Sequence, residues 1–210
     1  MSRFKINKVK LDLASYPFYI IMGQPKVGKT TLFDRIVKLY TGGPEGGLLI
    51  SVGKEGGYHA IDNIQVEEAP VWYKDPLDEN DSRGFVQIVD DLVENKDKYG
   101  IKLVGVDTLD ELYNIATEQV FLEHRQLKGS FPKSLNDALG GFGAGRARLT
   151  QIVVEQLTRL NRAGYAVFIL AHTKNKELKD ELTGEPYEVI TNNLNRDYFN
   201  AVANLAQMVV

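Results

Sequence analysis

The sequence predicts an α/β protein with a mostly parallel sheet that is flanked by helices on both faces. Two observations carry this prediction. Four short apolar runs, at 18–22, 48–52, 102–106 and 165–171, are nearly continuous rather than alternating, which is typical of strands covered on both faces. The segments between them repeat apolar residues at three- and four-residue spacing, which indicates amphipathic helices. Strands alternating with helices favour parallel pairing through right-handed crossovers.

The elements are expected in a simple order along the chain. Helices are predicted at 30–40, 85–99, 109–127 and 146–162, between and after the first three strands. Glycine-rich stretches separate them: a turn, TGGPEGG, at 41–47 and a long loop at 129–145. A hairpin that turns at TGEP is predicted over 175–191. The final AQMVV is typical of the start of a strand, either an edge strand or a sign that the natural chain continues past 210.

Composition limits the function classes. The 210 residues are expected to form a single domain, 1–210, and the net charge of −3 argues against general binding of nucleic acid through the overall field. The absence of cysteine excludes disulfides, thiolate metal sites and cysteine nucleophiles. The N-terminus does not resemble a signal peptide and the apolar runs have strand length, so we expect a cytoplasmic protein.

One motif carries chemistry. Directly after the first strand, GQPKVGKTT matches the pattern G-x-x-x-x-G-K-[ST] and opens the first predicted helix. In such a loop, backbone N–H groups surround phosphate oxygens, and a lysine places its charge on the β- and γ-phosphates. We therefore expect nucleotide binding by the residues of this loop, which are Gly23, Gln24, Pro25, Lys26, Val27, Gly28, Lys29, Thr30 and Thr31.

A phosphate loop requires a metal site. The Thr30 hydroxyl is expected to hold Mg²⁺ together with a carboxylate at the end of a neighbouring strand. Asp107 follows the third apolar run and would emerge at the same sheet edge. Its alternative role is to cap the helix that follows.

Hydrolysis also requires a group that orients or deprotonates water. Glu55 lies just beyond the second strand in a glycine setting and is the preferred candidate. Asp110 and Glu111 are the alternatives, although both are expected to face solvent or cap the helix, and a site without a protein base stays open. His172 follows the fourth strand and could contact the γ-phosphate or be structural. His59 and His124 are expected at the surface, and Trp72 in the core or an interface.

These residues together resemble a RecA-like P-loop ATPase, and more narrowly the bacteriophage proteins of the single-strand annealing recombination type. The resemblance runs from about residue 18 to the C-terminus and rests on GQPKVGKTT, LLISVGKEGG, LVGVDTLDELY and YAVFILAHTK. It implies ATP and Mg²⁺ as cofactors, Glu55 as the catalytic glutamate, Asp107 as the magnesium ligand and His172 as the γ-phosphate sensor. It also implies a homo-oligomer with nucleotide between subunits and single-stranded DNA in a central groove.

The charges of two stretches agree only in part with the DNA binding that the resemblance implies. Lys174, Lys176 and Lys179 are outnumbered by acidic residues over 173–185, which disfavours phosphate binding. Alternatively, Lys174 and Lys176 reach the γ-phosphate of a neighbouring subunit. The stretch 128–148 is basic, and its candidate DNA-binding residues are Lys128, Lys133, Arg146 and Arg148, with Phe131 and Phe142 as stacking groups. A disordered loop with solvated charges explains this stretch equally well.

Three functions follow from these expectations. The preferred function is an ATPase that couples nucleotide state to single-stranded DNA binding. The alternatives are a nucleotide-dependent switch that binds a protein partner without hydrolysis, and a small-molecule kinase. Base preference, oligomer number and pathway do not follow from the sequence.

Overall fold

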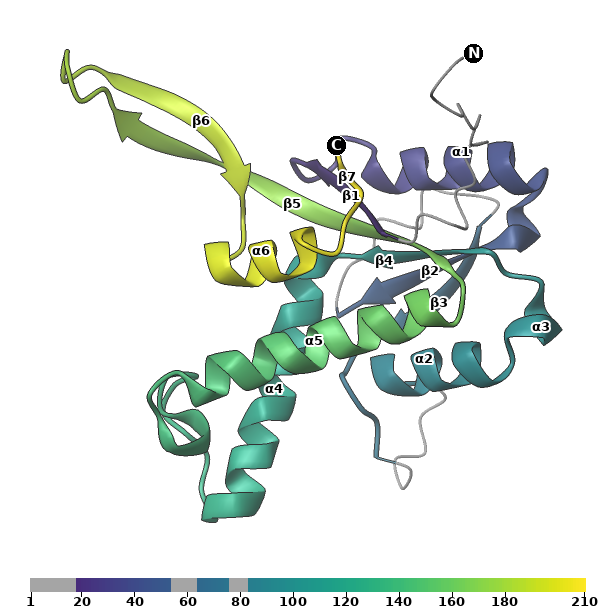
Figure 1. The fold of residues 1–210 in the computed structure, drawn as a ribbon, viewed down its shortest axis with the longest axis horizontal. Helices are drawn as coiled ribbons and strands as arrows, with labels where there is room; N and C mark the ends of the chain where they lie inside the picture. The colour runs from purple at the N-terminus through teal and green to yellow at the C-terminus, as the bar shows by residue number, and fades with distance from the viewer. Residues whose placement is uncertain (1–17, 54–63, 76–82) are drawn as a thin grey trace, which may run out of the picture.

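The computed structural model describes residues 18–53, 64–75 and 83–210 and has a seven-stranded sheet at its centre (Figure 1). The path of neighbouring strands is β3-β2-β4-β5-β1-β7, and the pairs along it are parallel. The strand bounds are β1 Phe18–Gly23, β2 Gly47–Val52, β3 Gln65–Ala69, β4 Leu103–Asp107, β5 Ala166–Lys179, β6 Pro186–Asn192 and β7 Met208–Val209. This confirms the predicted α/β fold with a mostly parallel sheet.

Helices cover both faces of the sheet. On one face, α1 (Lys29–Thr41) buries Phe33 and Val37 against β1, β2, β4 and β5. On the other, α2 (Phe85–Glu94), α4 (Leu109–Lys128) and α5 (Ala144–Arg162) enclose the larger core, as Figure 1 shows. None of the helices in the described part of the chain has the length and apolar character that a bilayer span requires.

The remaining elements differ from the prediction in detail. The helix expected over 85–99 is divided at Asn95, and its last turn forms α3 (Lys96–Tyr99). The strand β3 and the helix α6 (Arg196–Ala203) were not predicted. The described residues include two 3-10 turns, η2 (Pro44–Gly46) and η4 (Ala138–Gly140), the second within the expected loop 129–145. The terminal strand is confirmed as β7, which pairs with β1 at an edge.

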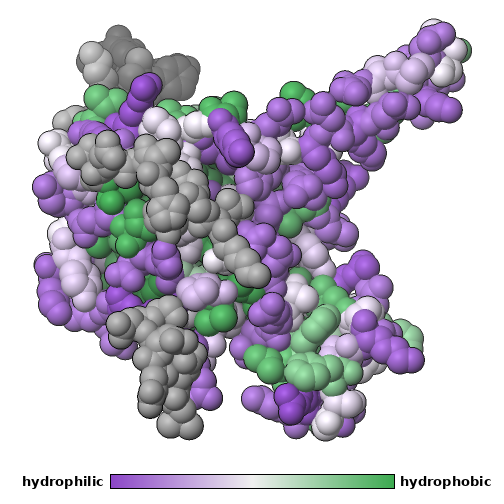
Figure 2. Space-filling model, turned by 180° about the vertical axis from the view of Figure 1, so that it is seen from behind, coloured by the Kyte–Doolittle hydropathy of each residue, from purple (hydrophilic) through white to green (hydrophobic). Residues whose placement is uncertain are grey.

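The strand β5 is longer than its apolar run. Its first part, through Ala171, is buried between β4 and β1, and the strand then leaves the sheet as one arm of the hairpin with β6. The pairing of Thr173 with Asn192 through Lys179 with Pro186 confirms the predicted hairpin. Figure 2 shows this hairpin as a narrow, mainly hydrophilic projection from the body of the molecule.

Candidate functional site

The phosphate loop connects β1 to α1 at the carboxyl end of the sheet. Gly28 has φ 98° at the N-cap of α1, a left-handed conformation that glycine adopts without steric cost. At Gly23, a Cβ atom would lie 2.6 Å from Cγ1 of Val27, so the loop closes too tightly for a side chain there. The predicted loop residues therefore form one continuous turn that leads into the positive end of the α1 dipole.

Lys29 is the first residue of α1 and is buried. Its Nζ atom donates to the carbonyl oxygens of Gly23, at 3.1 Å, and Gln24, at 3.0 Å. The ammonium group is thus folded over the loop, where the phosphate oxygens of a nucleotide would compete for the same N–H donors. The role of this lysine toward the β- and γ-phosphates stays a prediction.

Thr30 and Asp107 meet across the sheet edge. The Thr30 hydroxyl donates to Oδ2 of Asp107 at 2.8 Å, although the two residues are 77 positions apart. Burial raises the pKa of the Asp107 carboxyl, and the hydrogen bond from Thr30 and the charge of Lys29 oppose this rise. A hydroxyl and a carboxylate are the oxygen ligands that Mg²⁺ accepts, so the donor chemistry fits this ion.

His172 lies between these groups. It pairs in register with Gly23, and β5 separates the loop strand β1 from β4, which ends in Asp107. The expected strand end at His172 is wrong, because β5 continues to Lys179 in the hairpin. The imidazole nevertheless stands where the parallel sheet ends, half-buried beside the phosphate loop.

Asp110 is buried, contrary to the prediction that its side chain faces solvent. Only 8% of the residue is exposed, and its Oδ2 accepts a hydrogen bond from the backbone N–H of His172 at 3.0 Å. Its Oδ1 accepts from Nδ2 of Asn193 at 3.0 Å. The helix cap is instead Thr108, whose hydroxyl accepts from the N–H of Glu111. These partners lie far along the chain, so no local pattern reveals them.

The structure describes some of the candidate catalytic bases and not others. Glu55 lies outside the described residues, as does His59. Glu111 is half-buried, and Gly53 lies so close that a Cβ atom there would be 2.6 Å from its Oε2. The Glu111 carboxylate therefore borders Gly53, the residue that follows β2.

The basic stretch 128–148 forms a tip that consists of the end of α4, a loop that contains η4, and the start of α5, so the predicted loop is largely confirmed. Lys128 ends α4, Lys133 lies in the connection, and Arg146 and Arg148 belong to the first turns of α5. Arg148 donates to both carboxylate oxygens of Glu123, at 2.8 and 3.0 Å, so its charge is already balanced.

Two aromatic side chains are exposed on this tip. Phe131 is half-exposed beneath the Arg125 guanidinium, and Phe142 is fully exposed. Hydrophobic surface gathers at the same end of the molecule in Figure 2.

Two expectations for single aromatic side chains have opposite outcomes. Trp72 is buried and stacks on Phe85, which confirms a core position. His124 is not at the surface: it is 9% exposed, and its Nδ1 accepts from the N–H of Leu139 at 2.8 Å. It fastens the 3-10 turn η4 to α4.

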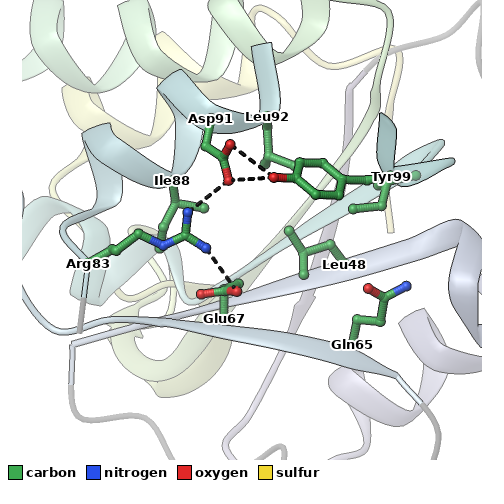
Figure 3. Close-up of a pocket in the computed structure, with 9 residues that line it drawn as sticks. Leu48, Gln65, Glu67, Arg83, Ile88, Asp91, Leu92 and Tyr99 are labelled. Atoms are coloured by element: carbon green, nitrogen blue, oxygen red, sulfur yellow. Dashed lines mark hydrogen bonds and ion pairs between the residues drawn. The ribbon is translucent and has the colours of Figure 1, made fainter. Parts of the chain in front are cut away.

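A separate pocket lies at the amino ends of the strands, away from the phosphate loop (Figure 3). Arg83 spans it, donating to Asp91 at 2.8 Å and to Glu67 at 3.1 Å, and the Tyr99 hydroxyl lies within 3.2 Å of Asp91. Burial acts to raise the pKa of Asp91, but hydrogen bonds from Arg83 and Tyr99 outweigh it and hold that pKa below its usual value. Both carboxylates in the pocket, Glu67 and Asp91, are thus already engaged by the protein.

Comparison with known proteins identifies the domain type. A family model described as an AAA domain matches residues 16–210. No curated protein matches the chain. The matched range spans β1 to the last residue and includes the phosphate loop, Asp107 and His172.

Proposed function

The chain belongs to this AAA domain family, a P-loop NTPase-type domain that binds nucleotide, and from this premise we propose that it is a Mg²⁺-dependent ATPase. The observation that carries the proposal is the 2.8 Å hydrogen bond from Thr30 to Asp107, beside the ammonium group of Lys29. Lys29 and Thr30 begin α1, which follows β1, whereas Asp107 ends β4, and β5 separates these two strands. Such convergence is what binding of a metal and a triphosphate requires.

Each residue of the candidate site has its own proposed role in binding or hydrolysis. Thr30 and Asp107 would hold Mg²⁺, which would supply positive charge that offsets the charge of the phosphates. The Lys29 ammonium would move from its carbonyl partners to the β- and γ-phosphates. His172 would contact the γ-phosphate from the adjacent strand. Glu55 would orient the attacking water, with Glu111 as the alternative.

The binding step is tested by Lys29→Ala. This variant should lose Mg²⁺-ATP binding, because the ammonium group that would contact the phosphates is removed. Its circular dichroism should stay that of the parent. Lys38→Ala is the matched control: Lys38 lies on the same helix and pairs with Asp34, away from the loop. Parent-like ATP affinity in Lys29→Ala would contradict the proposal.

We further propose that single-stranded DNA is the partner that nucleotide state controls, in recombination or annealing of the phage type in the host cytoplasm. The hairpin supports this because side chains alternate between the faces of a strand. Lys174 and Lys176 share one face with Tyr187 of the paired strand. Glu177 and Glu188 face each other on the opposite side. Acidic residues outnumber the lysines along this segment of the sequence, but the strand geometry places Lys174 and Lys176 on the face opposite these two glutamates.

The α4–α5 tip offers a second cationic surface for the same polymer. Lys128, Lys133 and Arg146 remain as candidates there, whereas Arg148 is paired with Glu123. With a net charge of −3 on the chain, DNA contacts must come from such local groups, repeated around a homo-oligomer that holds nucleotide between subunits. Lys174 donates to the backbone oxygen of Asn193 at 3.2 Å, so its ammonium is held near the hairpin base.

The DNA partner is tested by ATP turnover with and without single-stranded DNA. Stimulation supports the proposal. Tight ATP binding without turnover favours a switch that binds a protein, and turnover only with a phosphate acceptor favours a kinase.

The DNA surface is tested by Lys174→Ala/Lys176→Ala. This variant should bind any single-stranded sequence more weakly, with the slope of log affinity against log salt reduced by about 1.4 per subunit. Glu177→Gln/Glu188→Gln removes two charges from the opposite face and should not weaken binding. Equal weakening in both variants would contradict a cationic DNA face on the hairpin.

A further inference from the structure

A single buried carboxylate joins α4 to both strands of the hairpin. Asp110 lies in the first turn of α4 and accepts one N–H from His172 of β5 and one from Asn193, the residue after β6. The backbone closes the same cluster, because the N–H of Asn193 donates to the carbonyl of His172 at 3.0 Å. In addition, the distance between Nδ1 of His172 and Oδ2 of Asp110 is 3.6 Å.

This cluster lies where the hairpin leaves the sheet. His172 forms the last parallel pair with Gly23, and the next residue, Thr173, forms the first hairpin pair. Asp110 is three positions beyond Asp107 at the start of a rigid helix. One side chain therefore fixes the hairpin base relative to the carboxylate expected at the metal.

A cap or a solvated charge does not explain Asp110. Thr108 already serves as the N-cap, and the Asp110 carboxylate turns away from its own helix to partners 62 and 83 residues distant. A buried charge is costly unless donors satisfy it, and both donors here belong to the hairpin base. The phosphate loop reaches the hairpin as well, because Nε2 of Gln24 lies 3.4 Å from Oδ1 of Asn175.

We propose that Asp110 is a positioning residue, which holds His172 beside the phosphate loop and ties the direction of the β5–β6 hairpin to the occupancy of the ATP site. The inference rests on the proposed ATPase function. It assigns the coupling to the contacts of Asp110 with His172 and Asn193. A nucleotide that moves His172 or Asp107 then shifts both hairpin strands together, because the same carboxylate holds both.

The test measures hairpin direction directly. The chain has no cysteine, so Leu39→Cys on the exposed end of α1 and Thr183→Cys in the hairpin turn give two unique labelling sites. Spin labels on the full chain report the distance between them with and without a non-hydrolysable ATP analogue and Mg²⁺. Binding of the analogue is measured on the same samples.

Two variants weaken the link from opposite sides. Asp110→Ala deletes the carboxylate, and Asn193→Ala deletes one of its two donors and leaves the N–H of His172 in place. Asp90→Ala is the matched control, because it removes a carboxylate paired with Arg159 on the surface of α2 and α5. The Asn193 variant decides the question if Asp110→Ala does not fold.

The expected result is a distance shift on analogue binding in the parent and in Asp90→Ala. The shift should be lost in Asp110→Ala and Asn193→Ala although both still bind the analogue, and Asp110→Asn, which keeps an acceptor, should restore part of it. A parent that binds the analogue without a shift, or parent-like shifts in both variants, would overturn the inference and leave the ATPase proposal standing. A parent that does not bind the analogue would overturn both.

Discussion

At the scale of single residues, the buried carboxyl of Asp107 is unfavourable for the nucleotide-free fold. Its pKa is raised by burial, and the Thr30 hydrogen bond and the Lys29 charge compensate only in part. A carboxyl whose pKa is raised on folding stabilises the fold below its unfolded pKa, and this contribution disappears as the pH rises through the folded value. At neutral pH the ionised group is therefore a cost, as is common at functional sites.

Asp107→Asn should consequently stabilise the nucleotide-free protein. The amide keeps an acceptor for the Thr30 hydroxyl and removes the buried charge, so the free energy of unfolding in urea at pH 7 should rise by on the order of 1 kcal/mol. The same change should abolish Mg²⁺-dependent turnover. A lower unfolding free energy than that of the parent would show that the charge is fully compensated in the native site.

Glu55 and Glu111 are the two glutamates that are candidates for orienting the attacking water. Glu55→Gln should retain ATP and Mg²⁺ binding and lose about 10²–10⁴-fold in turnover, the usual loss for a general base. Glu118→Gln, on the exposed side of α4, is the control. A parent-like rate for Glu55→Gln together with a slow Glu111→Gln would transfer the role to Glu111.

At the scale of elements, Arg83 fastens the edge strand β3 to α2 through Glu67 and Asp91. The pKa of Asp91 is lowered on folding, so its contribution to stability is complete above the unfolded value and is lost as the pH falls through the folded value. The groups are partly exposed, which limits the pair to about 1 kcal/mol or less.

Asp91→Asn should therefore cost up to about 1 kcal/mol at pH 7 and less below about pH 4. Urea unfolding across pH 3–7 measures this. Asp97→Asn, an exposed carboxylate on α3, should leave the pH profile close to that of the parent. An Asp91 variant whose deficit grows toward acid pH would contradict the assignment.

The elements also show how far sequence patterns reach. Strands β1, β2 and β4 and the first part of β5 are buried on both faces, so their continuous apolar runs predicted them. The edge strand β3 is QVEEA and is partly exposed, so it lacks that signal. The outer half of β5, TKNKELK, is polar because it pairs with β6 alone and faces solvent.

In the candidate site, too, only the residues that a local sequence pattern marks could be predicted. The phosphate loop is a local motif, and Asp107 and His172 follow apolar runs, so sequence reasoning could find them. Asp110 could not be recognised, because its burial depends on His172 and Asn193, which the fold alone brings close. His124 was misjudged for the same reason: its partner, Leu139, belongs to a turn that glycine content alone suggests is irregular.

At the scale of the whole molecule, ligand binding should appear as stability. ATP with Mg²⁺ at about 100 times its dissociation constant adds about 2.7 kcal/mol to the free energy of unfolding. For a chain of this length, that raises the midpoint of thermal unfolding by roughly 5–11 °C. Lys29→Ala should show no rise and Lys38→Ala the full rise. A rise in Lys29→Ala equal to that of the parent would place the bound nucleotide elsewhere.

The long strand β5 has a consequence for amide hydrogen exchange. From Val167 to Leu170 the strand pairs with both β4 and β1, whereas from Thr173 to Lys179 it pairs with β6 alone. Deuterium should therefore enter the outer half through local fraying of the hairpin and the inner half only through global opening. A single uninterrupted strand would then show two exchange regimes that meet near His172, so the projecting part of β5 can melt and re-form while the central sheet keeps its protection.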